Sequence, residues 1–173
     1  MPNAKRNLEK LVKEAQAKGP PRSAEELEAG FKLWWRHLYS PVAWCQEALK
    51  FRPDTWQGGF ITCRDQQIIV NVSRQAGKTT TAAAKVLHRA LFFPGSVILL
   101  VAPAVPQATE FRVRLDEHLR VLEYQIETKE DNKRTLIFKN RSRIIIVAAD
   151  RDTTRGYTPH MIIEDEADRK SVV

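Results

Sequence analysis

The sequence contains only two cysteines among its 173 residues, and it has no long uninterrupted apolar run. Cys45 and Cys63 are too few for a disulfide framework or a cysteine-rich metal site, and they are typical of a reducing compartment. No stretch approaches the ~18 apolar residues of a membrane-spanning helix. The first ten residues are charged and lack an apolar core, which excludes a secretory signal. We therefore expect a soluble, intracellular protein with no membrane partner.

Acidic side chains are in the minority, because 21 Asp and Glu stand against 28 Lys and Arg, for a formal net charge of +7. This excess favours a polyanionic partner, with nucleic acid as the first candidate, although it says nothing about the fold. The basic side chains of residues 129–155 are expected to form a solvated face rather than a DNA contact. The length and the apolar content of 43% suit one globular domain with a substantial core.

A phosphate-binding loop is the strongest motif in the chain. The apolar run at residues 68–72 predicts a strand, Gly-Lys-Thr follows at residues 77–79, and an Ala-rich helical pattern comes next. In such a loop the backbone N–H groups and the helix N-terminus face the anion. Lys78 would reach the β- and γ-phosphates and Thr79 would bind Mg²⁺. The predicted ATP-binding residues of the loop are Ser73, Arg74, Gln75, Ala76, Gly77, Lys78, Thr79 and Thr80.

The loop departs from the general pattern at one position, where Val72 replaces the first glycine. Gly77 supplies the close backbone approach that a phosphate needs. Without the acidic motif further along the chain, an ordinary strand-to-helix turn with an exposed lysine would explain the same residues.

The N-terminal part of the sequence has helical patterns. Residues 5–18 place apolar side chains at helical spacing, and Ser23 with Glu26 matches a capping box that opens a second helix. Trp34 and Trp35 lie on the apolar side of this helix. We expect them in the core rather than stacked on nucleic-acid bases.

After the loop, strands and helices alternate. The apolar run at residues 97–102 is typical of a parallel strand buried on both faces, and residues 107–122 predict a helix. Residues 125–128 and 135–138 indicate a hairpin that leads into a strand at residues 143–148. This alternation predicts an α/β fold, namely a three-layer α/β/α sandwich of the P-loop NTPase type with a mostly parallel sheet.

The last predicted strand, residues 161–163 with Glu164, is followed by the carboxylates of Asp165 and Glu166. Ligands of open α/β sheets bind at the carboxyl ends of the strands. A nucleotide hydrolase needs one acid there for Mg²⁺ and a second group for the attacking water. We assign Asp165 to Mg²⁺ and Glu166 to the water. An alternative register uses Glu164 and Asp165, and a strand that ends in acidic residues at solvent is the simplest alternative.

Two further side chains have open assignments. Gln57, in a short predicted helix capped by Asp54 or Thr55, could donate to and accept from the adenine edge. It could also be a surface residue beside Trp56. Arg155 could reach the transition-state charge on a phosphoryl group, in cis or from a neighbouring subunit, or it could lie at the surface or contact a DNA phosphate.

From about residue 51 to 170, these motifs resemble the large terminase subunit of tailed bacteriophages, the DNA-packaging motor. The loop Ser-Arg-Gln-Ala-Gly-Lys-Thr is similar to that of terminases, which often lack the first loop glycine and carry an arginine there. The resemblance also rests on Trp56-Gln57, Ala102-Pro103 with Gln107-Ala108, Arg155-Gly156 and residues 162–167.

The resemblance implies an ATPase that uses ATP and Mg²⁺ to thread double-stranded DNA into a procapsid in the host cytoplasm. It implies Gln57 at adenine, Arg74 and Lys78 at the phosphates, Thr79 and Asp165 at Mg²⁺, Glu166 as the catalytic glutamate, and Arg155 as a finger acting in trans. The implied partners are double-stranded DNA, further copies of the chain in a ring (commonly a pentamer), the portal and the small terminase subunit.

The family's coupling motif and nuclease domain are not found in this sequence, so the chain resembles the N-terminal piece of a longer subunit. We expect residues 1–50 to form an N-terminal helical segment that acts as a lid or linker. Residues 51–173 would form a P-loop ATPase core, truncated on its C-terminal side. Such a piece is expected to bind ATP but to hydrolyse it weakly.

Two rival functions stay open. Asp165-Glu166-Ala167-Asp168 spells the tetrapeptide of DEAD-box helicases of superfamily 2, which RNA-stimulated ATPase activity would favour. The loop at residues 73–79 lacks the glycine-rich form of those helicases, which argues against them. The other rival is a nucleotide-binding ring subunit without turnover, for which Glu166 would be dispensable.

Overall fold

The computed structural model describes residues 23–122, 128–132, 134–148 and 156–165. The chain divides into two units between Trp35 and Arg36, inside the helix α2 (Ala24–Tyr39). The helix predicted at residues 5–18 lies outside the described residues. The boundary that the sequence predicts at residue 50, between a helical lid or linker and an ATPase core, stays a prediction.

Helix α2 begins with the predicted capping box. The Glu26 N–H donates to Ser23 Oγ at 3.1 Å, and the Ser23 N–H donates to Glu26 Oε2 at 3.0 Å. Trp34 and Trp35 contact each other and Phe31, with ring centroids 5.5–6.5 Å apart. They are 44% and 38% exposed, so the prediction that they lie in the core is wrong. Spacing of i, i+3 and i+4 brings the three rings together along one stripe of the helix, and that spacing alone does not bury the stripe.

Among its described residues, the second unit contains the further helices α3 (Pro41–Glu47), α4 (Thr55–Thr62), α5 (Lys78–Phe92) and α6 (Val105–Val121). Local chemistry explains where two of them begin. Ser40 caps α3 by accepting from the Ala43 N–H at 3.3 Å, with Pro41 in the first turn. Asp54 caps α4 in a capping box with Gln57. None of the helices in the described residues combines the length and apolar character needed to span a bilayer.

The strands of the described residues form one mixed sheet in the order β2-β3-β4-β1-β5. Strand β1 (Val97–Ala102) lies between β4 (Arg143–Ala148) and β5 (Met161–Glu164) and is parallel to both. The hairpin of β2 (Thr128–Asp131) and β3 (Thr135–Phe138) adds the antiparallel half. The first hairpin strand thus begins at the last residue of its predicted range, whose other residues lie outside those described. The predicted α/β class is confirmed. The sheet, predicted as mostly parallel, is mixed, with β4, β1 and β5 parallel and the hairpin antiparallel.

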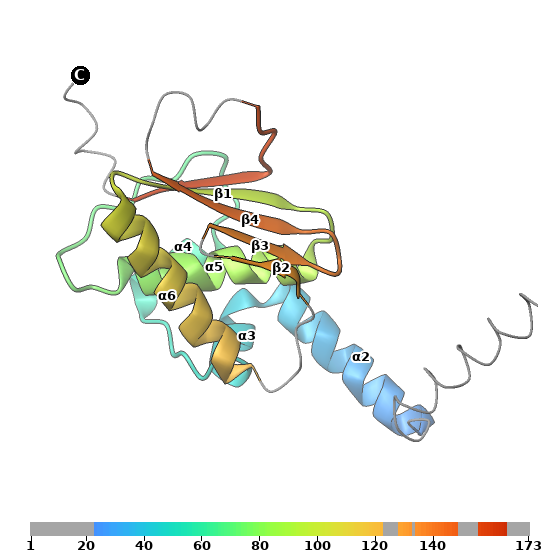
Figure 1. The fold of residues 1–173 in the computed structure, drawn as a ribbon. Coiled ribbons are helices and arrows are strands. Elements are labelled where there is room, and N and C mark those ends of the chain that lie inside the picture. The colour runs from blue at the N-terminus through green and yellow to red at the C-terminus, as the bar shows by residue number, and fades with distance from the viewer. Residues whose placement is uncertain (1–22, 123–127, 133, 149–155, 166–173) are drawn as a thin grey trace, which may run out of the picture. The chain divides into compact units, whose positions relative to one another are not determined.

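The sheet buries apolar side chains on both faces, because successive residues of a strand point to opposite sides. On one face the strands pack with α3, α4, α5 and α6 around Trp44, Leu87 and Leu115, each of which is fully buried. Figure 1 shows α4, α5 and α6 on this side of the sheet. The other face carries a smaller buried cluster of Val97, Leu99, Val101, Ile145 and Val147.

Residues 68–72, which the sequence predicts as the strand before the loop, do not form a strand. Ile69 is 95% exposed. In the described part of the chain the sheet ends at β5, and none of its strands pairs with this segment. An apolar run becomes a strand only where another strand supplies hydrogen-bond partners. The prediction of a strand at residues 68–72 is therefore wrong.

Candidate nucleotide-binding site

The loop before α5 has the backbone of an anion-binding site. Gly77 is the N-cap of α5 with φ of 78°, and Gln75 also has a positive φ of 61°. Within the described residues, no side chain caps this helix. The first-turn N–H groups of an uncapped helix attract anions, because they lack intrahelical acceptors and lie at the positive end of the helix dipole.

Lys78 lies across the same loop. Its Nζ donates to the carbonyl oxygens of Val72 and Ser73, at 3.0 Å each. The predicted loop residues Ser73, Arg74 and Gln75 are exposed, whereas Ala76 and Gly77 are half-buried. The ammonium group is therefore held against the loop by two of its carbonyl groups.

Thr79 and Asp165 are 86 residues apart in sequence, and the fold brings them together. Thr79 Oγ1 lies 3.5 Å from Asp165 Oδ2. The position of Asp165 follows from the sheet, because β5 is parallel to β1 and the Asp165 N–H donates to the Val101 carbonyl at 3.0 Å. This geometry agrees with the register in which Asp165, rather than Glu164, is the metal ligand.

A hydroxyl and a carboxylate are ligands that Mg²⁺ accepts, since it prefers oxygen donors and keeps several waters. The described residues contain no cluster of three or more His, Cys, Asp or Glu side chains that could hold a metal. An uncapped helix start at Lys78, with the oxygens of Thr79 and Asp165 beside it, fits a Mg²⁺-bound triphosphate.

Gln57 of the adjacent helix α4 is hydrogen-bonded to the loop. Its side chain is 9% exposed, so it is not a surface residue. Its Oε1 accepts from the Asp54 N–H at 3.0 Å, and its Nε2 donates to the Ala76 carbonyl at 3.1 Å. One amide N–H and one lone pair stay available for a base, which suits the predicted adenine contact.

Gly77 leaves little room for a side chain on the Gln57 side. A Cβ added at Gly77 would lie 3.0 Å from Gln57 Nε2, closer than atoms normally approach. The close contact between the α4 amide and the loop backbone thus depends on a glycine at this position, both for its positive φ and for its lack of a Cβ.

Two polar residues near the loop were missed by sequence reasoning. His118 of α6 donates from Nε2 to the Thr80 carbonyl at 3.0 Å, and Lys85 of α5 donates to carbonyls at the end of α4. Burial lowers the pKa of both side chains. A signal existed for His118, since it interrupts the apolar stripe of Phe111, Leu115 and Leu122 at helical spacing. A buried polar residue in such a stripe usually has a specific hydrogen-bond partner.

The structure thus brings Gln57, the loop residues, Thr79 and Asp165 to one place. Glu166 and Arg155 lie outside the described residues, so their predicted roles stay predictions.

Comparison with known proteins places this geometry in a family. Residues 69–171 match the family model described as terminase large subunit, T4likevirus-type, N-terminal. No curated protein sequence matches the chain. The crystal structure of the HK97 bacteriophage large terminase is similar to this fold, with a TM-score of 0.62 and 18% identity. The match covers 75% of this chain and 31% of that one, so the chain spans about a third of the length of the solved terminase.

The matched residues include the loop at residues 73–79, α5 and Asp165, whereas Gln57 precedes the matched range. The resemblance inferred from the sequence is therefore confirmed: the chain belongs to the terminase large subunit family, T4likevirus-type, N-terminal region.

Proposed function

We propose that this chain is the ATP-binding and ATP-hydrolysing region of a DNA-packaging motor. The observation that carries the proposal is the contact between Thr79 of the loop helix and Asp165 at the end of β5. A nucleotide hydrolase needs this convergence, because one metal must meet both the loop hydroxyl and the acidic strand end. A turn with an exposed lysine would not require it.

Each residue has a defined role in the proposed reaction. Lys78 and the N–H groups of the first turn of α5 bind the phosphates, and Arg74 adds a second cation beside them. Thr79 and Asp165 would hold Mg²⁺, which would supply positive charge to neutralise the phosphates. Glu166 orients or deprotonates the water that attacks the γ-phosphate.

Two further residues act on the base and on the transition state. The free N–H and lone pair of the Gln57 amide contact the adenine edge. Arg155 stabilises the charge that develops on the phosphoryl group, from this chain or from a neighbouring copy.

The motor context is supported by the family and by the charge of the chain. A net charge of +7 favours binding to duplex DNA, whose phosphates give sequence-independent affinity. We propose that the complete subunit packages double-stranded DNA into a procapsid. It would act as a ring of copies, a pentamer in the full-length motor, together with the portal and the small terminase subunit in the host cytoplasm.

Two variants test the proposed enzyme. Lys78→Ala should weaken ATP binding about a hundredfold, because it removes the phosphate cation. Glu166→Gln should keep ATP binding but abolish turnover. The exposed Lys129 of β2 offers a matched control, since Lys129→Ala removes one positive charge far along the sequence from the loop.

Calorimetric ATP titration and phosphate release measure these effects. The proposal fails if the wild-type chain does not bind ATP, or if Lys78→Ala binds it as tightly as Lys129→Ala does. Unchanged turnover in Glu166→Gln contradicts the assigned catalytic role. Stimulation of turnover by duplex DNA, rather than by RNA, is the expected sign of a packaging motor.

A further inference from the structure

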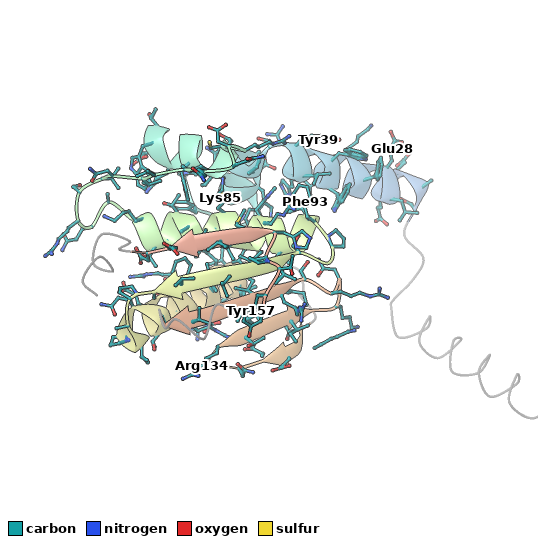
Figure 2. All side chains as sticks on the ribbon, turned by 90° about the horizontal axis from the view of Figure 1, so that it is seen from above. Glu28, Tyr39, Lys85, Phe93, Arg134 and Tyr157 are labelled. Carbon is teal, nitrogen blue, oxygen red and sulfur yellow. The ribbon has the colours of Figure 1, made fainter. Side chains whose placement is uncertain are left out.

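Lys85 lies in the middle of α5 and is directed toward the C-terminal end of α4. Its Nζ donates to the carbonyl oxygens of Phe60 at 2.7 Å, Ile61 at 3.2 Å and Cys63 at 2.7 Å. The same Nζ lies 5.0 Å from the centroid of the Phe60 ring. Figure 2 labels Lys85 where α5 passes α4. One side chain of α5 thus contacts three carbonyls of the last turn of α4.

The chemistry of this contact matches the needs of a helix end. The last carbonyls of an α-helix lack intrahelical donors and carry the negative end of the helix dipole. A lysine ammonium has three N–H donors and no acceptor, so three carbonyls use its full capacity. Burial lowers the pKa of Lys85, which reflects the cost of holding this charge away from water. The three hydrogen bonds to the end of α4 compensate for this cost.

Helix α4 needs such an anchor, because its eight residues are too few for a stable helix on their own. Only Gln57 and Ile61 of this helix are buried. The first turn of α4 carries Gln57, whose Nε2 donates to the Ala76 carbonyl of the phosphate loop. Helix α4 is therefore held at both ends. Lys85 contacts its C-terminal end, and the phosphate loop contacts its N-terminal turn.

We propose that Lys85 is a positioning residue for the nucleotide site. By holding the C-terminal end of α4 on α5, it keeps the Gln57 amide against Ala76 and Gly77 in the arrangement that binds nucleotide. The inference rests on the proposed function for its effect on ATP, but the anchoring of α4 itself can be measured without nucleotide.

The test is a double-mutant cycle between Lys85 and Gln57. Lys85→Met keeps the length of the side chain but removes the donors. We expect Lys85→Met and Gln57→Ala each to weaken ATP binding about tenfold. Because both changes act through one contact, the double variant should bind ATP no more weakly than either single variant, within about twofold. ATP affinity is measured by calorimetry at a temperature where each variant is folded by circular dichroism.

Arg112→Met is the matched control. Arg112 of α6 bonds to Asp116, Asp131 and the Asn132 carbonyl, so this variant also removes a cation that ties a helix to another segment. It should lower thermal stability but leave ATP affinity unchanged. Lys85→Arg keeps the charge and N–H donors and should restore part of the lost affinity.

Several results would overturn the inference. They are an unchanged ATP affinity in Lys85→Met, an equal loss in Arg112→Met, or single effects that multiply in the double variant. If the wild-type chain does not bind ATP, the proposed function fails instead. Hydrogen exchange then decides about Lys85: Lys85→Met should speed exchange of the α4 amides but not those of α6, and unchanged exchange in α4 would refute the anchor.

Discussion

The two ends of α5 lie in different surroundings. At the N-terminal end, Lys78, Thr79 and Thr80 are half-exposed, and the helix starts from a left-handed Gly77. From Thr81 to Phe92, most side chains are buried. One helix thus combines a packed part, which supplies stability, with a half-exposed first turn that we propose binds the nucleotide. Changes in the two parts should therefore affect different measurements.

The largest effect on stability is expected in the packed part. Leu87 is fully buried, and Leu87→Ala should lower the free energy of unfolding by about 3 kcal/mol, because it leaves a cavity. Urea denaturation measures this change. Val113→Ala, at a 46% exposed position of α6, should cost less than about 0.5 kcal/mol. A folded Leu87→Ala variant that also loses affinity for ATP would contradict the separation between the packed part and the first turn of α5.

The next effect is a loss of stability in acid that comes from the packed part. Burial lowers the pKa of His88 to about 4, and its Nε2 donates to the His37 carbonyl at 2.9 Å. The unfolded chain, with a histidine pKa of about 6.5, binds the proton more readily than the folded chain does. The stabilising contribution of neutral His88 is therefore complete above pH 6.5, and it is lost as the pH falls toward 4, by about 3 kcal/mol.

Urea denaturation at pH 7, 5.5 and 4.5 tests this dependence. His88→Gln keeps a donor but does not titrate, so its stability should fall less steeply over this range. Burial also lowers the pKa of His118, which adds to the acid sensitivity with the same sign, and His118→Gln separates the two. Parallel pH profiles for wild type and His88→Gln would contradict the assignment to His88.

The smallest effect on stability is expected at the loop end. Gly77→Ala should cost about 1–2 kcal/mol, because φ of 78° strains an L-residue. It should also weaken ATP binding, since the new Cβ would press on Gln57. Gly95→Ala is a matched control: its φ is 75°, but open space surrounds the added Cβ. Equal ATP affinities for the two variants would show that contact with Gln57 does not matter.

The sequence predicted the elements whose signal is local. The continuous apolar runs of β1 and β4 and the apolar face of α5 identify buried elements without knowledge of their neighbours. The convergence of Thr79 with Asp165 was also expected, on the premise that a strand before the loop and β5 end at one edge of the sheet. The two side chains meet although residues 68–72 do not form that strand.

The parts that depend on distant partners could not be predicted. Residues 68–72 are as apolar as many strands, but strand pairing depends on a neighbour that the local pattern does not reveal. The exposure of Trp34 and Trp35 could not be predicted for the same reason, because helical spacing identifies an apolar stripe but not the residues that cover it. Lys85 has no sequence signal at all, because its partners are backbone carbonyls that any residues could supply.

The central claim is that Thr79 and Asp165 share one Mg²⁺ with ATP. The most direct test is calorimetric titration of ATP with and without Mg²⁺ into the wild-type chain, Asp165→Asn and the neighbouring control Glu164→Gln. We predict that Mg²⁺ tightens ATP binding about tenfold in the wild type and in Glu164→Gln, but not in Asp165→Asn, which should still bind metal-free ATP. A full Mg²⁺ effect in Asp165→Asn would contradict the account.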